Sequence, residues 1–221
     1  MTREELSNYI DNSILIGNVI TEDSPIYKLY NDIAIMRDAT LLLGSVNAEG
    51  FYVKKDSNNK ICLVYHDAID YKYEDIDLGD CIDIIEAEAF AWNHRVKRVT
   101  GKSVVEIGDS SFSSSDIELV NFPNLKKIGF CAFYMSHIKE VVFNKVKIIS
   151  GHAFEESDLV SFRGDKVEVV EVGGFSYCDN LQTLILPKAK EIHLGYRENT
   201  YDRYRGVTNL KIPKKCEFLY D

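Results

Sequence analysis

The chain has 221 residues, of which 28% are charged, and a formal net charge of −9 at pH 7. Its apolar runs, such as those at residues 14–16 and 41–43, are far shorter than the ~20 residues of a membrane-spanning helix. The acidic balance argues against nucleic acid as a partner, because phosphate-backbone binding relies on clustered Lys and Arg. The length suffices for one sizeable core or for a repeat array with a capping region.

The first residues, Met-Thr-Arg-Glu-Glu, lack the positive region and apolar stretch of a signal peptide. The five cysteines are an odd number and include no CxxC pair, which is typical of reduced, structural thiols. Together with the absence of a membrane span, these features predict a cytoplasmic protein.

Two helices are predicted near the N-terminus. Thr2 and Glu5 have the spacing of a capping box, which opens a helix that includes Leu6 and Ile10. A second start signal is Ser24-Pro25, with Ser as the N-cap and Pro at the first helical position. Apolar residues then recur at helical spacing, which predicts a helix of about four to five turns: Ile26, Leu29, Ile33, Met36 and Leu43.

A β-hairpin is expected after these helices. Residues 51–53 and 61–65 are apolar, and the polar run between them contains Asn58-Asn59, a pair suited to a tight turn. We therefore interpret residues 1–79 as an N-terminal capping region of helices and a hairpin, because solenoids must cover an apolar end. The alternative is a separate binding element built from the two helices.

From residue 80 onward the chain repeats. Five phenylalanines lie 22, 21, 21 and 21 residues apart, each five residues after Ile or Val: Phe90, Phe112, Phe133, Phe154 and Phe175. Three residues after each Phe comes a small hydrogen-bonding residue suited to a buried turn: Asn93, Ser115, Ser136, Ser157 and Cys178. A period in the twenties predicts one supersecondary unit copied along the chain.

Each copy continues with two short apolar steps. The first has the spacing of a strand with one face in the core, as in Ile117, Val120 and Phe122, and the second leads into the next copy through residues such as Leu125. Each coil therefore has two straight edges and a Phe-containing corner. We expect residues 80–221 to form a solenoid of about six coils with an atypical last repeat.

This pattern resembles the BspA-type leucine-rich repeat, whose copies contain aliphatic-Gly-x-x-Ala-Phe followed by Cys, Ser or Asn, as in Ile128-Gly-Phe-Cys-Ala-Phe133 and Ser136. The resemblance covers about residues 80–213. It implies an α/β repeat solenoid, right-handed and curved, with a parallel strand ladder on its inner side. It also implies a role in protein binding or cell-surface contact.

Motifs for catalysis or cofactor binding are lacking. There is no phosphate-binding Gly loop, no nucleophile elbow and no HExxH motif. Cys131 and His152 occupy the same position in consecutive copies, so they should stack about 5 Å apart. A zinc site normally needs at least three protein ligands, so two neighbouring turn residues are the favoured interpretation. We predict no catalytic residue, no cofactor and no metal.

The repeat assigns outward-facing side chains to the strands, because residues alternate faces along a strand. Stacking the copies predicts two outward columns. The first column is Arg98, Leu119, Glu140, Ser161, Thr183 and Asn209; the second is Thr100, Asn121, Val142, Arg163, Ile185 and Lys211. The mixture of aliphatic and charged residues is typical of a protein-binding face. The alternative is an ordinary surface with isolated aliphatic residues.

The last copy contains an insertion at residues 195–206. Tyr and Arg, the residues most enriched at interface hot spots, are concentrated there: Tyr196, Arg197, Tyr201, Arg203, Tyr204 and Arg205. This insertion is a second candidate binding element, or a C-terminal cap in which tyrosines cover the last coil.

These observations predict a non-enzymatic protein-recognition module, acting as adaptor, effector or inhibitor. It would bind a partner protein through the outward columns of Arg98, Leu119, Glu140, Val142, Arg163 and Ile185, through the Tyr/Arg insertion, or through both. Two alternatives stay open. One is a cell-surface adhesin-type repeat domain; the other is a small metal-dependent protein with its site in residues 1–79 or at Cys131 and His152.

Overall fold

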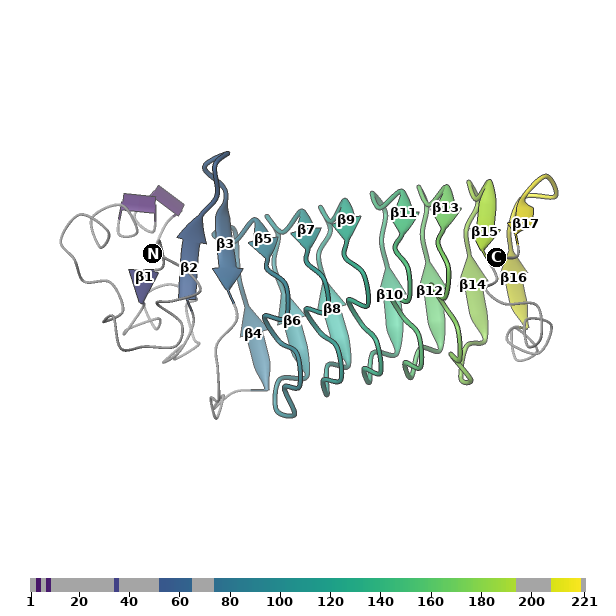
Figure 1. Ribbon diagram of the computed structural model, residues 1–221, viewed down its shortest axis with the longest axis horizontal. Coiled ribbons are helices and arrows are strands. Elements are labelled where there is room, and N and C mark those ends of the chain that lie inside the picture. Colours follow the sequence, from purple (N-terminus) through teal and green to yellow (C-terminus); the bar gives the residue numbers. More distant parts are fainter. Residues whose placement is uncertain are drawn as a thin grey trace.

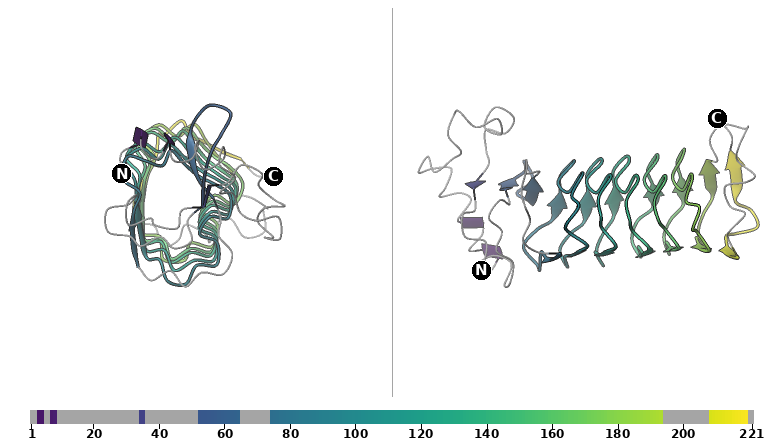
Figure 2. Two further views of the ribbon diagram at one scale, coloured as in Figure 1. Left: turned by 90° about the vertical axis from the view of Figure 1, so that its left-hand side faces the viewer. Right: turned by 90° about the horizontal axis from the view of Figure 1, so that it is seen from below.

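The computed structural model describes residues 3–4, 7–8, 34–35, 52–64, 74–193 and 208–219. Within these residues the chain winds into coils that stack side by side in a single row (Figure 1). Seen along the row, the coils superimpose as one closed outline (Figure 2). Each coil contributes one strand to each of two ladders.

The first ladder contains three-residue strands, and the spacing of the strand triplets predicts most of them. Its strands are β4 (Asp75–Asp77), β6 (Arg98–Thr100), β8 (Leu119–Asn121), β10 (Glu140–Val142), β12 (Ser161–Arg163), β14 (Thr183–Ile185) and β16 (Asn209–Lys211). The central residue of each strand from β4 to β14 is buried and its two neighbours are more exposed, so one face of the ladder packs on the core.

The second ladder consists mainly of two-residue strands. Its strands are β3 (Ile61–Val64), β5 (Ile84–Ile85), β7 (Glu106–Ile107), β9 (Lys127–Ile128), β11 (Ile148–Ile149), β13 (Val169–Val170), β15 (Glu191–His193) and β17 (Glu217–Leu219). Strand pairing in both ladders is parallel, in the register that the repeat period predicts; for example Val141 pairs with Phe162 and Phe162 with Leu184.

The Phe corner of each coil is a turn with two residues in the left-handed backbone conformation. These residues lie two positions before and two after the phenylalanine, with φ between 52° and 71°, as at Cys131, Met135 and Gly173. Left-handed residues cannot continue a right-handed helix. The expectation of an α/β solenoid is therefore wrong in its helical part, since the described coils contain strands and turns only.

A row of stacked phenylalanine rings fills the core beside the corners. Ring centroids of consecutive members are 5.0 to 5.5 Å apart: Phe90, Phe112, Phe133, Phe154 and Phe175. The backbone N–H of Phe112 donates to the Ala132 carbonyl of the next coil at 2.8 Å, and the other corners repeat this bond. The corner thus joins neighbouring coils through both backbone and side chains.

The N-terminal region matches the expectation only in part. The hairpin is confirmed: β2 (Tyr52–Lys55) pairs antiparallel with β3, and Asn59 takes the left-handed turn conformation. Residues 3–4 and 7–8 are helical, whereas Ala34–Ile35 forms strand β1, which pairs with β2. The long second helix is therefore wrong at its centre, because pairing with the free edge of the hairpin overrides the weak local helical preference.

The ladders also reach further toward the N-terminus than residue 80. Strand β3 of the hairpin pairs in parallel with β5, and β4 pairs in parallel with β6. The hairpin is therefore continuous with the second ladder. This continuity covers the first regular coil without a separate interface.

Both ladders are interrupted at one junction. The first ladder divides between β8 and β10, and the second divides between β9 and β11. Figure 1 shows a wider spacing between these two coils than between the others. The corners stay in contact there, with the rings of Phe133 and Phe154 5.1 Å apart. We call this junction the seam.

The seam coincides with an unusual pair of core residues. Phe122 and Phe143 follow β8 and β10 at the same repeat position. In the coils on either side of them this position is Gly101 or Gly164. At each flanking junction this position pairs one phenylalanine with one glycine, whereas at the seam it pairs two phenylalanines. The two phenylalanines thus coincide with the junction at which the strands are not paired, while the corner stays closed.

Candidate protein-binding face

The outward columns lie where the repeat spacing predicts them. The register pairs Arg98 with Leu119 in the first column and Arg163 with Ile185 in the second. Strand β4 extends both columns by Asp75 and Asp77, two residues that precede the predicted start of the repeats at residue 80. Their alternation around the buried Ile76 is the signal that could have identified them as part of a strand.

The centre of this face is apolar. Leu119 is 42% exposed and Val142 is 58% exposed, on the strands β8 and β10 that flank the seam. Ile185 on β14 is half-buried. Leu119 belongs to the first column and Val142 to the second, on the two strands that border the seam. They are two exposed apolar positions in the middle of the face, which a partner surface can cover.

Charged residues surround this centre, and most of them are paired within the chain. Arg98 Nε lies 2.6 Å from Asp75 Oδ1, and Arg163 Nε lies 2.8 Å from Asp165 Oδ1. The carboxylate of Asp75 raises the pKa of the Arg98 guanidinium through a hydrogen bond. Glu140 has no ion pair with another described residue. Its carboxylate is therefore available to a cationic group of a partner.

The Tyr/Arg insertion at residues 195–206 lies outside the described residues. The structure thus places the column residues of the predicted site but not Tyr196, Arg197, Tyr201, Arg203, Tyr204 or Arg205.

The outer edge of the Phe corners carries exposed apolar side chains that the sequence analysis did not single out. Trp92 is 71% exposed, Met135 46% and Tyr177 45%. All three occupy the second left-handed position of their corner, with φ of 58°, 52° and 53°. Each of these residues stands two positions after the phenylalanine of its copy, so alignment of the copies could have placed them in one row.

Cys131 and His152 are neighbours in consecutive corners, as the spacing predicts, but their surroundings do not resemble a metal site. His152 Nδ1 lies 2.5 Å from Glu155 Oε2, and the imidazole contacts the ring of Phe130 edge-on at 5.2 Å. The part of the chain that the structure describes has no group of three or more His, Cys, Asp or Glu residues arranged to hold a metal.

All five cysteines are free thiols. Cys178 replaces the serine of the preceding corners, and its Sγ lies 2.9 Å from the Phe154 carbonyl oxygen. Burial raises the pKa of the Cys178 thiol to about 12. A thiol that stays protonated at neutral pH is a poor nucleophile and metal ligand, so Cys178 serves a structural role.

The repeat period, the parallel ladders and the aligned corners define a leucine-rich-repeat solenoid. The chain belongs to the BspA-type leucine-rich repeat family: its family model matches residues 69–182, just over half of the chain, in six copies. The match begins before residue 80, in agreement with the observed place of β4 in the first ladder. No curated protein sequence matches the chain significantly.

Solved structures of leucine-rich repeat proteins resemble the fold. A leucine-rich repeat protein from Eubacterium ventriosum aligns with a TM-score of 0.53 at 12% identity, over 78% of this chain and 60% of that protein. A T. pallidum leucine-rich repeat protein aligns at 17% identity with a TM-score of 0.44, over 77% of this chain and 84% of that one. A leucine-rich cell surface protein of Faecalibacterium prausnitzii aligns at 16% identity with a TM-score of 0.41, over 73% and 38% of the respective chains.

The chain therefore spans less than two thirds of the E. ventriosum protein, and this likeness concerns the fold alone. Among the described residues, no helix is long and apolar enough to cross a membrane.

Proposed function

We propose that this chain is a non-enzymatic recognition module that binds a partner protein through the outward face of the first ladder. The observation that carries the proposal is the apolar centre of Leu119 and Val142, flanked by the paired cation Arg98 and the unpaired Glu140. An apolar centre with a polar rim is the usual composition of a protein interface. Membership of a leucine-rich repeat family supports the same class of function.

The stiffness of the scaffold also supports recognition. Parallel pairing holds the strands of the face in place on each side of the seam, and the stacked rings join the coils across it. Few side chains other than those on the surface therefore lose freedom on binding. Preorganised surfaces bind more tightly for a given contact area. The Tyr/Arg insertion is proposed as a second contact with the same partner, on the basis of its composition alone.

The test is affinity capture with the full chain, comparing wild type with Leu119→Ala/Val142→Ala. A partner protein retained by the wild type should be lost from the double variant, since truncating two central apolar residues typically costs more than 1 kcal/mol of binding energy each at a hot spot. Met135→Ala is the matched control, because Met135 is similarly exposed but lies on the corner edge. Tyr201→Ala/Arg203→Ala/Tyr204→Ala tests the insertion in the same way.

Retention of the same partner by the Leu119/Val142 variant, with unchanged circular dichroism, would contradict the proposal for the ladder face. Loss of the partner only in the Met135 variant would move the interface to the corner edge.

For the compartment, we propose the cytoplasm, because five cysteines that form no disulfide suit a reducing environment. An adhesin-type role predicts the opposite outcome, a chain accessible to protease on intact cells. Cell fractionation combined with protease treatment separates the two.

A further inference from the structure

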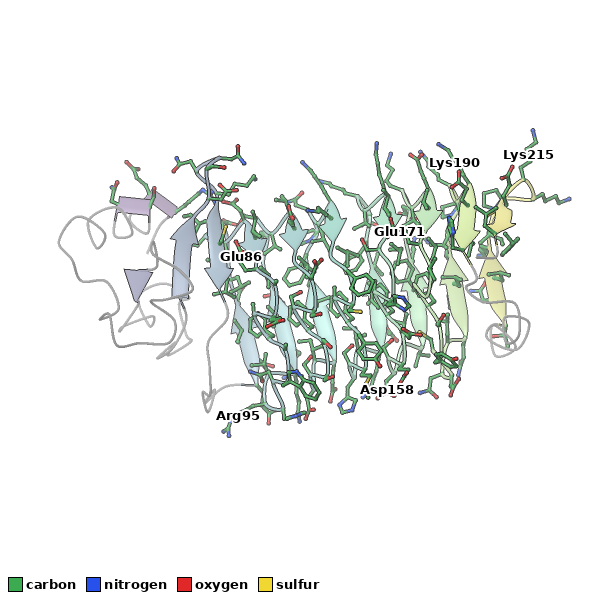
Figure 3. The ribbon with its side chains drawn as sticks, in the orientation of Figure 1. Glu86, Arg95, Asp158, Glu171, Lys190 and Lys215 are labelled. Carbon is green, nitrogen blue, oxygen red and sulfur yellow. The ribbon has the colours of Figure 1, made fainter. Side chains whose placement is uncertain are left out.

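The seam opens a groove between β9 and β11. The groove has a volume of about 570 Å³ and is lined by Lys126, Lys127, Ile128, Lys145, Lys147, Ile148, Ser150 and Glu171. Figure 3 labels Glu171 beside this groove. Four of its eight lining residues are lysines, although the chain as a whole is acidic. We call it the seam groove.

Backbone groups that are paired at the other junctions face the seam groove without partners. At the junction before it, the Val105 carbonyl accepts from the N–H groups of Lys126 and Lys127 at 2.9 and 3.2 Å. At the junction after it, the Lys147 carbonyl accepts from Glu168 and Val169 at 2.7 and 3.3 Å. At the seam the corresponding bonds, from Lys147 and Ile148 to the Lys126 carbonyl, are not formed within the described residues.

One side chain partly replaces the lost pairing. The Ser150 hydroxyl donates to the Ile128 carbonyl at 2.6 Å. At the preceding junction the equivalent bond comes from the backbone, because the Gly129 N–H donates to the Ile107 carbonyl at 2.8 Å. No such replacement satisfies the N–H groups of Lys147 and Ile148. Two adjacent unpaired donors at the wall of a groove are suited to an anion.

The lysines of the seam groove differ in their availability. Lys127 Nζ lies 2.5 Å from Glu106 Oε1, and Lys145 Nζ lies 2.5 Å from Asn124 Oδ1. Lys126 and Lys147 have no ion pair with a described residue within contact distance. They are 21 residues apart and face each other across the seam as like charges. A bound anion would neutralise this repulsion.

The acidic groups around the groove are already engaged. Glu171 Oε2 accepts from the Gly151 N–H at 2.9 Å. Glu168, which lies close enough to interact with Lys147, is ion-paired with Lys190. Among the described residues, no carboxylate forms an ion pair with the ammonium group of Lys126 or Lys147, so both remain open to an external anion.

We propose that the seam groove binds an acidic peptide segment of a protein partner, with a carboxylate held by the N–H groups of Lys147 and Ile148 and by the side chains of Lys126 and Lys147. Charge-assisted hydrogen bonds of this kind are about twice as strong as neutral ones. The groove is far larger than one carboxylate, and the exposed Ile148 side chain gives its lining an apolar surface, so neighbouring peptide atoms are buried against it as well. A free phosphate ion would use the same donors but not this apolar surface.

This inference rests on the proposed recognition function in one respect only, namely that the acidic peptide segment belongs to a partner protein. The seam groove belongs to the second ladder, whereas Leu119 and Val142 belong to the first. A direct titration with a synthetic peptide requires no knowledge of the partner. Its failure and the failure of the ladder-face proposal are therefore distinguishable.

The experiment is a titration of the full chain, labelled with ¹⁵N, with N-acetylated and C-amidated hexaglutamate, and separately with inorganic phosphate. We expect the largest amide shifts at Lys147 and Ile148 on addition of the peptide. Lys126→Gln/Lys147→Gln should weaken peptide binding by about fivefold or more, since each charge contributes up to about 1 kcal/mol at a partly exposed site.

The matched control is Lys214→Gln/Lys215→Gln, which removes the same charge from exposed lysines at the C-terminal end of the row (Figure 3). This variant should bind the peptide as the wild type does, and thermal melting verifies that both variants are folded. Equal weakening in the two variants, or shifts spread over other lysines, would overturn the proposal. Shifts of Lys147 and Ile148 with phosphate but not with the peptide would overturn the assignment to an acidic peptide.

Discussion

Phenylalanine recurs at the corner of every coil, and serine and glycine recur at corner positions of some coils, because each meets a different physical requirement. The phenylalanine fills the core and stacks on its copies. The serine three residues later satisfies a buried carbonyl: Ser115, Ser136 and Ser157 donate to the phenylalanine carbonyl of their own corner at 2.7 to 2.8 Å. A buried carbonyl without a partner would cost about 1 to 3 kcal/mol. The corner therefore tolerates little variation at these positions.

Glycine at the start of the corner has a separate cause. A Cβ atom at Gly129 would lie 2.4 Å from the backbone of Gly108 and Asp109 in the preceding coil. The close approach of the two backbones therefore excludes any side chain there. The seam has Ser150 at this position instead.

Replacing Phe133 by Ala should lower the free energy of unfolding by about 3 to 5 kcal/mol, because it removes a fully buried ring from the centre of the stack. Phe130→Ala is the matched control, since Phe130 is 51% exposed, and its loss should be about 1 kcal/mol or less. Urea denaturation followed by circular dichroism measures both. A loss below about 1 kcal/mol for Phe133→Ala would contradict the observed register of the core.

At the scale of the strand, the parallel ladders distribute stability unevenly. Most junctions are joined by backbone bonds in both ladders and at the corner. The seam retains the corner bonds, such as Phe133 N–H to the Ala153 carbonyl at 2.7 Å, but lacks strand pairing. The coils on its two sides are thus connected chiefly through the stacked rings and the corner backbone.

Hydrogen exchange should reveal this difference. The amides of Lys147 and Ile148 have no hydrogen-bond partner among the residues that the structure describes, so they should exchange at least on the order of tenfold faster than those of Glu168 and Val169, which donate to the Lys147 carbonyl. The two pairs occupy equivalent repeat positions, so each serves as the control for the other. Equal protection, measured by NMR in deuterated water, would show that the seam is closed in solution.

At the scale of the whole molecule, the solenoid is a one-dimensional array in which a coil contacts mainly its neighbours. The Phe112 ring contacts that of Phe133, and the Phe133 ring contacts that of Phe154. Energetic coupling between coils should therefore fall off after one step.

Double substitutions to leucine test this prediction. Phe133→Leu and Phe154→Leu, which remove rings in direct contact, should show a coupling energy of about 0.5 kcal/mol or more. Phe112→Leu and Phe154→Leu, separated by one coil, should be additive within about 0.5 kcal/mol. Chemical denaturation of the single and double variants gives both values. A coupling for the separated pair as large as for the adjacent pair would contradict nearest-neighbour stabilisation.

Much of the fold could be predicted from the repeat. A period of 21 or 22 residues aligns Phe133 with Phe154 and Val141 with Phe162, and the ladders show this alignment. The outward columns follow from the same alignment, whereas their role in binding stays a prediction. Strand β1 could not be predicted, because the pairing of Ala34–Ile35 with the hairpin depends on Val53 and Tyr52, which are distant in sequence. Local spacing favours a helix there, and tertiary pairing decides otherwise.

The sequence by itself determined which residues of the solenoid face the core, because a strict period assigns every copy the same inside and outside. Only the tertiary structure decided where the array departs from regularity. Lys126 and Lys147 are one period apart, and this spacing marks them as neighbours. Their shared groove lies at the junction where the strands of both ladders are not paired, which leaves backbone donors exposed beside the two charges. Whether two neighbouring strands pair depends on how the coils pack on each other, and a repeat pattern does not contain that information.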